Sequence, residues 1–302
     1  MPVRPAPKWG TGLQEVAPNT YAYLQYDGSW GISNTGFMEG DDGVLVIDAT
    51  LVASMAEAFV KEIRRVSDKP FRHLVNTHSH PDHTGGNRLF AGAEIISHRI
   101  CREEMARPAL RPPAGGNGGP PPGPMQAMRT PAMDRMFKQI AEDPDREITL
   151  PSVTYDEKLT LRYGDTEVEL LYFGPAHTFG DTLVYFPQSK LLFAGDVAFF
   201  YSMPLAAAGK IGGWLKVIDR VKDMDVEMIV PGHGPVGGKQ ELEDEREYFE
   251  FVMEQTKRCF EAGMTPEQAV EAIDLGPYKD WLDSERIIAN VGVVYRELRG
   301  EI

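Results

Sequence analysis

Three of the chain's seven histidines fall within the six residues that begin at His78. His78 and His80 are two positions apart, and side chains at that spacing on an extended segment point to the same side. The proline after His80 fixes its own φ and disfavours helix at His80, which keeps the segment extended. Asp82 and His83 then face a second point. Two imidazoles at one position and a carboxylate–imidazole pair at a neighbouring one predict two adjacent sites for divalent metal ions.

Each of these two sites needs further ligands from elsewhere in the chain. His177, Asp196 and His233 each follow an apolar, β-prone run. Ligands on short loops at the C-terminal ends of strands commonly build open catalytic sites in α/β folds. We interpret the remaining candidates, His73 and His98, as structural residues because they belong to no such cluster.

Patterns of apolar residues indicate the elements that must position these side chains. Two runs of strands are predicted, each followed by helix, with a helical tail after Gly238. No internal repeat of solenoid period is found. The predicted strands cover 20–26, 32–39, 43–48, 71–76, 159–163, 166–173, 182–186, 190–194 and 227–230, and the predicted helices cover 52–66, 212–223 and 239–262, with others beginning near 131, 266 and 283–284.

Between the two runs, proline and glycine dominate residues 108–124, and we predict an exposed, poorly ordered insertion there. Thr130 and Pro131 then form a helix-start signal. The helix that follows carries methionines on one face, including Met133 and Met136. We interpret them as core, with a substrate-facing role left open.

Composition limits the classes of function. The 302 residues carry 31 Lys+Arg against 45 Asp+Glu, a formal net charge of −14, which opposes nucleic acid as a partner. Hydrophobic residues make up 42% of the chain, enough for a sizeable core. Cys101 and Cys259 are the only cysteines, so no disulfide framework is predicted. The N-terminus has no apolar signal region and no window reaches a membrane span of about 18 apolar residues, so we predict a cytoplasmic protein without membrane association.

Together these motifs resemble the metallo-β-lactamase superfamily of binuclear metallohydrolases. The likeness covers roughly residues 20–238 and follows the family's order: Val46-Ile47-Asp48, the HxHxDH motif at 78–83, then His177, Asp196 and His233. It implies an α/β fold, a four-layer αββα sandwich with the metals at one edge of two packed sheets. The predicted domain then spans 1–238, including the insertion, and a C-terminal helical extension at 239–302 packs on it.

The resemblance also implies a role for each motif residue. Asp48 matches the family's buried acid, which orients ligand imidazoles, with an ordinary strand-end turn as the alternative. The first metal would be bound by His78, His80 and His177, the second by Asp82, His83 and His233, with Asp196 bridging the two.

This ligand count implies a mechanism. Two divalent ions per chain, with zinc favoured over iron or manganese, would leave open positions for water and lower its pKa towards about 7. The hydroxide so formed needs no serine or cysteine nucleophile, and the sequence contains no Gly-x-Ser-x-Gly elbow. Asp82 is our candidate for the catalytic residue that orients the hydroxide and passes its proton to the leaving group.

The sequence departs from the true β-lactamases at several positions. Asp196 replaces the cysteine ligand of their most common class, as in glyoxalase II and the homoserine lactonases. Phe199 stands where those enzymes have a lysine for the β-lactam carboxylate and where lactonases have a tyrosine, unless Tyr201 takes that part. Lys210 is the nearby cation that could hold a substrate carboxylate. The turn at Trp30 sits where β-lactamases carry a flap that closes over substrate.

We therefore predict a metal-dependent hydrolase of a small-molecule ester, lactone, thioester or amide. The aromatic, apolar segment 197–205 suggests a substrate with a hydrophobic body, although its side chains could equally pack under the loop. Two alternatives stay open: a β-lactam-hydrolysing enzyme, and a mononuclear iron oxidoreductase of the sulfur-dioxygenase type. The partner would be a small molecule, and a homodimer through the C-terminal helices is left open.

Overall fold

The computed structural model describes residues 4, 7–26, 28–107, 124–144 and 147–302. The predicted insertion lies outside these residues, except for Pro124. None of the helices in the described ranges has the length and apolarity needed to cross a bilayer.

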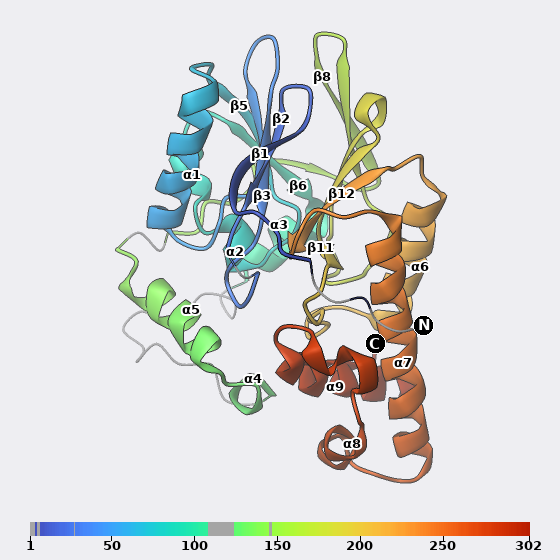
Figure 1. Cartoon of the computed structure of the whole chain (residues 1–302). Coiled ribbons are helices and arrows are strands. Elements are labelled where there is room, and N and C mark those ends of the chain that lie inside the picture. Colours follow the sequence, from blue (N-terminus) through green and yellow to red (C-terminus); the bar gives the residue numbers. More distant parts are fainter. Residues whose placement is uncertain (1–3, 5–6, 27, 108–123, 145–146) are drawn as a thin grey trace.

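Two mixed sheets pack against each other (Figure 1). Within the described residues the first sheet has seven strands, antiparallel from β1 to β4 and parallel from β4 to β7. They lie in chain order: β1 (Gly12–Ala17), β2 (Thr20–Leu24), β3 (Thr35–Glu39), β4 (Val44–Ile47), β5 (Phe71–Val75), β6 (Glu94–His98) and β7 (Val153–Tyr155).

The second sheet has five strands among the described residues, and only its β11–β12 pair is parallel. This parallel pair matters for the site, because both strands end at the same edge of the sheet. The order is β12 (Met228–His233), β11 (Leu191–Phe199), β10 (Leu183–Phe186), β9 (Thr166–Leu171) and β8 (Lys158–Tyr163).

Strand β4 illustrates why the first sheet is covered on both faces. All four of its side chains are buried, and successive side chains point to opposite faces. Leu45 and Ile47 face the second sheet, in one apolar cluster with Val184 and Phe193. Val44 and Val46 instead belong to the cluster of α1 (Ala53–Val66). The first sheet is thus enclosed between α1 and the second sheet.

The outer face of the second sheet is covered by the C-terminal helices. Trp214 of α6 (Ile211–Asp223), Phe249 of α7 (Lys239–Glu261) and Val291 of α9 (Ile287–Leu298) share one core with Leu192 of β11. The layers therefore run helix, sheet, sheet, helix, which confirms the predicted αββα sandwich. The other described helices are α2 (Pro81–Thr84), α3 (Arg99–Met105), α4 (Pro124–Ala127), α5 (Pro131–Glu142) and α8 (Pro266–Ala272), with short 3₁₀ turns at Asn87–Phe90, Pro187–Ser189, Gly276–Asp280 and Ser284–Arg286.

Most predicted elements form close to their expected bounds. Thr130 caps α5 by accepting the amide of Met133, as its signal predicted, and Thr265 and Gln268 cap α8 reciprocally. Strand β11 runs to Phe199, five residues beyond the predicted end. Strands β1, β6 and β7 were not predicted. The boundary between domain and extension at 238 stays a prediction, since α7 and α9 share the core of the second sheet.

Candidate metal centre

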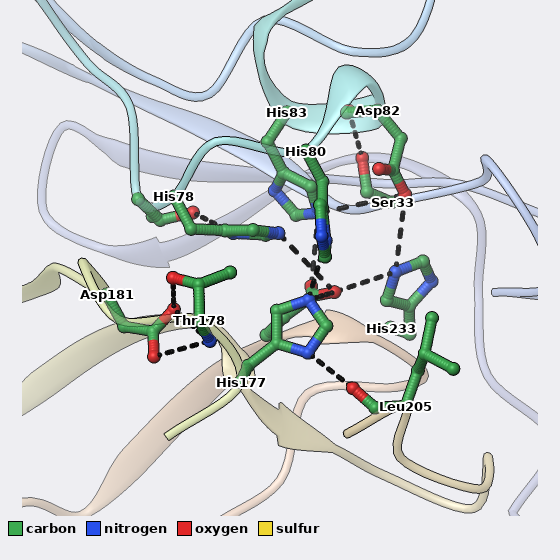
Figure 2. A network of polar contacts seen from close by, with 12 residues as sticks. Ser33, His78, His80, Asp82, His83, His177, Thr178, Asp181, Leu205 and His233 are labelled. Carbon is green, nitrogen blue, oxygen red and sulfur yellow. Dashed lines mark hydrogen bonds and ion pairs between the residues drawn. The ribbon is translucent and has the colours of Figure 1, made fainter. Parts of the chain in front are cut away.

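Side chains from both sheets converge at one edge of the sandwich (Figure 2). His78 and His80 follow β5, and Asp82 and His83 lie on α2, directly after the extended backbone of His80. The second sheet supplies the ligands from a loop after β9, from within β11 and from the end of β12. The seven described side chains form two groups, and within each group the ligand atoms lie within 4.8 Å of one another. The first group is His78, His80, His177 and Asp196, and the second is Asp82, His83 and His233.

In the first group, nitrogen atoms aim at the carboxylate of Asp196. His177 Nε2 lies 2.8 Å from His80 Nδ1 and 3.2 Å from Asp196 Oδ2. His78 Nε2 lies 3.7 Å from the same oxygen. Three imidazole nitrogens and one carboxylate oxygen so arranged suit a tetrahedral divalent ion.

In the second group, the carboxylate of Asp82 takes the corresponding place. Its Oδ2 lies 3.8 Å from His83 Nε2 and 3.5 Å from His233 Nε2. Asp196 also reaches this group, since its Oδ1 lies 3.0 Å from His83 Nε2 and its Oδ2 3.4 Å from His233 Nε2. The Asp196 carboxylate therefore lies between the two groups, which is the arrangement the sequence led us to expect of a bridging ligand.

Several of these atoms have no hydrogen-bond partner in the described structure. His78 Nε2, His83 Nε2 and Asp196 Oδ1 are buried and make no hydrogen bond, although His83 Nε2 and Asp196 Oδ1 face each other at 3.0 Å. A buried polar atom left unpaired costs about 1–3 kcal/mol, so proteins rarely contain several together. Buried nitrogen and oxygen atoms that lack hydrogen bonds and converge on one place suit the binding of divalent metal ions. The His/Asp cluster is therefore compatible with a two-metal site.

The outer nitrogens of the imidazoles are fixed by backbone carbonyls. His177 Nδ1 donates to the Leu205 carbonyl at 2.7 Å, and His233 Nδ1 donates to the Gly28 carbonyl at 2.9 Å. In each ring Nδ1 carries a proton, and Nε2 is the atom directed at the cluster. Such partners set both the tautomer and the direction of a metal-binding imidazole.

Asp48 contacts the corresponding nitrogen of His83. It is 2% exposed, and its Oδ2 accepts from His83 Nδ1 at 2.8 Å and from Thr77 Oγ1 at 2.7 Å. Its Oδ1 accepts the Thr77 amide at 2.8 Å. Burial raises the pKa of Asp48, with His83 opposing that shift. The contact with His83 is the one expected of this acid, and its orienting role stays a prediction.

Burial and mutual charge divide the imidazoles into two kinds. Burial lowers the pKa of His177 to about 3 and also lowers the pKa of His78, so both rings are neutral at pH 7. Burial also disfavours charge on His233, but the carboxylates of Asp196 and Asp82 outweigh it and raise its pKa to about 9. For Asp82, burial is outweighed by His83 and His233, which lower its pKa to about 2.

Glycine at 232 is required by the close approach of Asp196. A Cβ at Gly232 would overlap Oδ1 of Asp196. The β12 backbone therefore packs directly against the carboxylate that lies between the two groups. The Pro-Gly-His-Gly sequence owes its first glycine to this contact.

The predicted substrate contacts fall into different environments. Phe199 is buried, and its ring stacks on His233 with centroids 4.9 Å apart. Trp30 is 6% exposed, with its indole Nε1 donating to Glu285 at 2.7 Å, so it is a packed side chain and not an exposed flap tip. The Tyr201 hydroxyl donates to Glu241 of α7 at 3.4 Å, which does not favour a substrate contact. Lys210 precedes α6, and its amide bonds to the Ala176 carbonyl beside His177. The substrate roles of these four residues stay predictions.

Other residues hold the site together and were not predicted. Asn34 Nδ2 donates to the Pro231 and Gly234 carbonyls at 3.0 and 2.8 Å, which holds the backbone on both sides of His233. Ser33 Oγ donates to the Asp82 carbonyl at 2.6 Å. A backbone acceptor gives no sequence signal, because any residue type can supply it.

The histidines interpreted as structural are held outside the cluster. His73 Nδ1 lies 2.6 Å from the Tyr163 hydroxyl, and His98 Nε2 donates to the Asp156 carbonyl at 2.9 Å. The methionine face of α5 forms core, as interpreted: Met133 is fully buried beside Trp30, with Met136 packed against them.

The described geometry can now be compared with known proteins. The family model described as the metallo-beta-lactamase superfamily matches residues 28–233. This chain belongs to the metallo-beta-lactamase superfamily. The match begins at the loop that holds His233 and ends at His233 itself, so it contains every candidate ligand.

Individual relatives are distant. A linear primary-alkylsulfatase of Pseudomonas sp. (strain ATCC 19151) is 23% identical over 268 residues, which cover 80% of this chain and 50% of that protein. The alpha subunit of a 2,4-dinitroanisole O-demethylase of Nocardioides sp. (strain JS1661) is 25% identical over 207 residues, 67% of this chain and 53% of the subunit. The chain thus spans about half the length of these curated relatives.

Among solved structures, a stereoselective inverting sec-alkylsulfatase from Pseudomonas sp. superposes with a TM-score of 0.72 at 19% identity. The alignment covers 97% of this chain and 51% of that one. At this identity the likeness establishes the fold. It includes the C-terminal helices, because nearly the whole of this chain is aligned.

Proposed function

We propose that this chain is a binuclear, zinc-dependent hydrolase that cleaves a small-molecule ester, lactone, thioester or amide. The observation that carries the proposal is the convergence of seven His and Asp side chains into two adjoining groups that share Asp196. The first group would hold one divalent ion and the second group the other. Bound ions of this kind supply Lewis acidity and lower the pKa of water towards about 7.

Asp82 is the candidate for handling the proton. Its pKa of about 2 in the metal-free chain keeps the carboxylate ionised at neutral pH, which leaves its oxygens available as acceptors but makes it a weak base. Only its Oδ2 faces His233 and His83, at 3.5 and 3.8 Å, and these are weak contacts. Asp82 is also more exposed than Asp196, with a side-chain exposure of 14% against 4%. A substrate oxygen can therefore reach Asp82 more readily than Asp196.

A hydrophobic substrate body is supported by the surroundings of the cluster. Phe199 stacks on His233 and lies 5.7 Å from the His177 ring, between centroids. Leu205, whose carbonyl accepts from His177, is only partly buried and packs on the cluster of Trp30. Partly exposed apolar side chains next to the ligands suit an alkyl or aryl group.

A sulfate ester is the second candidate substrate, and the comparisons favour it. Two of the relatives described above are named alkylsulfatases. The buried guanidinium of Arg286 is already paired with Asp283 at 2.8 Å, so it is not free to hold a sulfate. Lys210, whose amide bonds to the Ala176 carbonyl beside His177, is our candidate for supplying that charge.

The mononuclear iron alternative is less well supported by the geometry. Such a centre would use the first group and leave the second without a function. His83 Nε2, which is buried without a hydrogen bond, belongs to the second group, and a second ion would give that atom a partner.

The test is a metal count joined to a panel of substrates with one common alkyl chain. Zinc-loaded protein is assayed with a carboxylic ester, a lactone, a thioester, an amide, a β-lactam and an alkyl sulfate. We expect two metals per chain and hydrolysis of one oxygen or sulfur ester. Asp196→Ala should abolish it, whereas Asp219→Ala, a change at a surface partner of Arg246, should not. Full activity in Asp196→Ala, or one iron with O₂ uptake, would overturn the proposal.

A further inference from the structure

The two carbonyls that orient His177 and His233 lie in segments held by the same stretch of C-terminal chain. Leu205 accepts from His177 of the first group, and Gly28 accepts from His233 of the second. Both segments contact residues 283–290, around the start of α9. One element outside the matched family region thus lies behind one ligand of each group.

Asn290 holds the Leu205 carbonyl from both sides. Its Oδ1 accepts the Ala206 amide at 2.9 Å, and its Nδ2 donates to the Pro204 carbonyl at 2.8 Å. Asn290 is fully buried, and its Nδ2 also donates to the Tyr248 hydroxyl at 2.8 Å. A side chain that bonds the residues immediately before and after Leu205 fixes the direction of the carbonyl between them.

The Gly28 carbonyl is held by the two residues that follow it. Ser29 Oγ donates to Asp283 Oδ1 at 2.7 Å, and Trp30 Nε1 donates to Glu285 Oε1 at 2.7 Å. Gly28 itself has a φ of +61°, and a Cβ there would lie 2.9 Å from the Gly234 amide. The loop therefore approaches the His233 backbone closely and is tied on its other side to the C-terminal chain.

Arg286 connects these two attachments. Its Nη1 donates to the Met203 carbonyl at 2.9 Å, just before the Leu205 segment. Its guanidinium lies 4.7 Å from the Trp30 ring centroid and pairs with Asp283 at 2.8 Å. Arg286 is 2% exposed, and a buried charge persists only where it is paired and hydrogen-bonded, as here.

We propose that residues 283–290 position the metal centre. Asn290 acts on His177 of the first group, and Asp283 and Glu285 together act on His233 of the second group. These are positioning residues, because each acts through a backbone carbonyl and none reaches the cluster. The inference rests on the proposed pair of metal sites, but not on which bond the protein hydrolyses. Partners of ligand imidazoles typically contribute 10- to 100-fold to metal affinity, and action through a carbonyl should give about 10-fold.

The test is a stepwise titration of the metal-free full chain with Zn²⁺ and with Co²⁺. Calorimetry measures each binding step, and the visible absorption spectrum reports the coordination of Co²⁺. His177→Ala and His233→Ala first identify which binding step belongs to which group. We expect Asn290→Ala to weaken only the His177 step, by about 10-fold. Glu285→Ala should weaken only the His233 step, and Glu285→Gln, which keeps the acceptor for Trp30, should restore it.

A matched control lies on the same helix. The Tyr295 hydroxyl donates to the Met264 carbonyl at 2.9 Å, away from both loops, so Tyr295→Phe should leave both steps and the Co²⁺ spectrum unchanged. Equal weakening of both steps in Asn290→Ala and Glu285→Ala, or no change beyond that of Tyr295→Phe, would overturn the inference. If Asn290→Ala does not fold, the two variants of the half-buried Glu285, Glu285→Ala and Glu285→Gln, test the inference by the same criterion. Wild-type protein that binds no metal would instead overturn the proposed function.

Discussion

Replacing Asp48 with asparagine tests how far one buried carboxylate controls a metal ligand. Asp48→Asn keeps the size of the side chain and its Oδ1, which accepts the Thr77 amide. The new amide group would occupy the place of Oδ2, where His83 Nδ1 and Thr77 Oγ1 now donate. The His83 and Thr77 donors would then face the NH₂ group of the new asparagine, which is also a donor. His83 could relieve this repulsion by moving its proton to Nε2, the atom that faces the cluster.

The magnitude follows from the bond that is lost. A hydrogen bond to a charged group contributes about 1.5–3 kcal/mol. At about 1.4 kcal/mol for each factor of ten, this corresponds to roughly 10- to 100-fold in affinity for the ion bound through His83. The loss should fall on metal affinity because a bound cation makes the Nδ1 proton more acidic and strengthens its bond to Asp48.

The assay is competition for Zn²⁺ with a chelator of known affinity, together with thermal unfolding of the metal-free proteins. Glu39→Gln is the matched control: it is also a carboxylate-to-amide change, and Glu39 pairs with Val44, at the opposite end of β4 from Asp48. Asp48→Asn with both metal affinities equal to those of Glu39→Gln would refute the reasoning. A loss shared equally by both sites would show that the effect is general destabilisation.

Further predictions concern the metal centre as a whole. Chelation should abolish hydrolysis and lower the free energy of unfolding by about 2.7 kcal/mol for each bound ion, relative to protein at a free metal concentration of 100 times Kd, as measured by denaturant unfolding. Gly232→Ala should displace Asp196 and lower the affinity for both ions, which metal analysis after gel filtration would detect. In metal-free protein the pKa of His233 is raised to about 9, so its contribution to stability is full below about 6.5 and disappears as pH rises through 9. Metal uptake should release a proton from His233 below pH 9, which calorimetry in buffers of different ionisation enthalpy would count.

The sandwich was largely predictable because its strands are short apolar runs with clear turn signals. The apolar run Val44–Ile47 is an example, since such a run is typical of a strand buried on both faces. Strand β1 was missed because its burial pattern is mostly intermediate, so it carries no alternation of apolar and polar residues. Strand β7 has only three residues, too few to show a period.

The convergence of the seven candidate ligands was predictable for a different reason. Metal chemistry requires particular residue types, and those types are rare enough for their spacing to be informative. The residues that orient the ligands escape such analysis. Leu205 and Gly28 act through carbonyls, and Asn290 is an ordinary helix residue until the fold brings it to Leu205. The packing of the Trp30 indole escapes such analysis for a similar reason, because its partners lie far along the chain, at Glu285 and Ala289.

The distribution of ligands between the sheets links metal binding to the packing of the sandwich. His78 and His80 come from the first sheet, whereas their partners His177 and Asp196 come from the second. The second group is divided in the same way, and neither sheet alone supplies a complete set. Each bound ion would therefore cross-link the two sheets. The cross-link would lie at the edge opposite the turn that joins β3 to β4. Substitutions in the core between the sheets should then alter metal affinity even where they touch no ligand, because the distance between the two half-sites is set by that core.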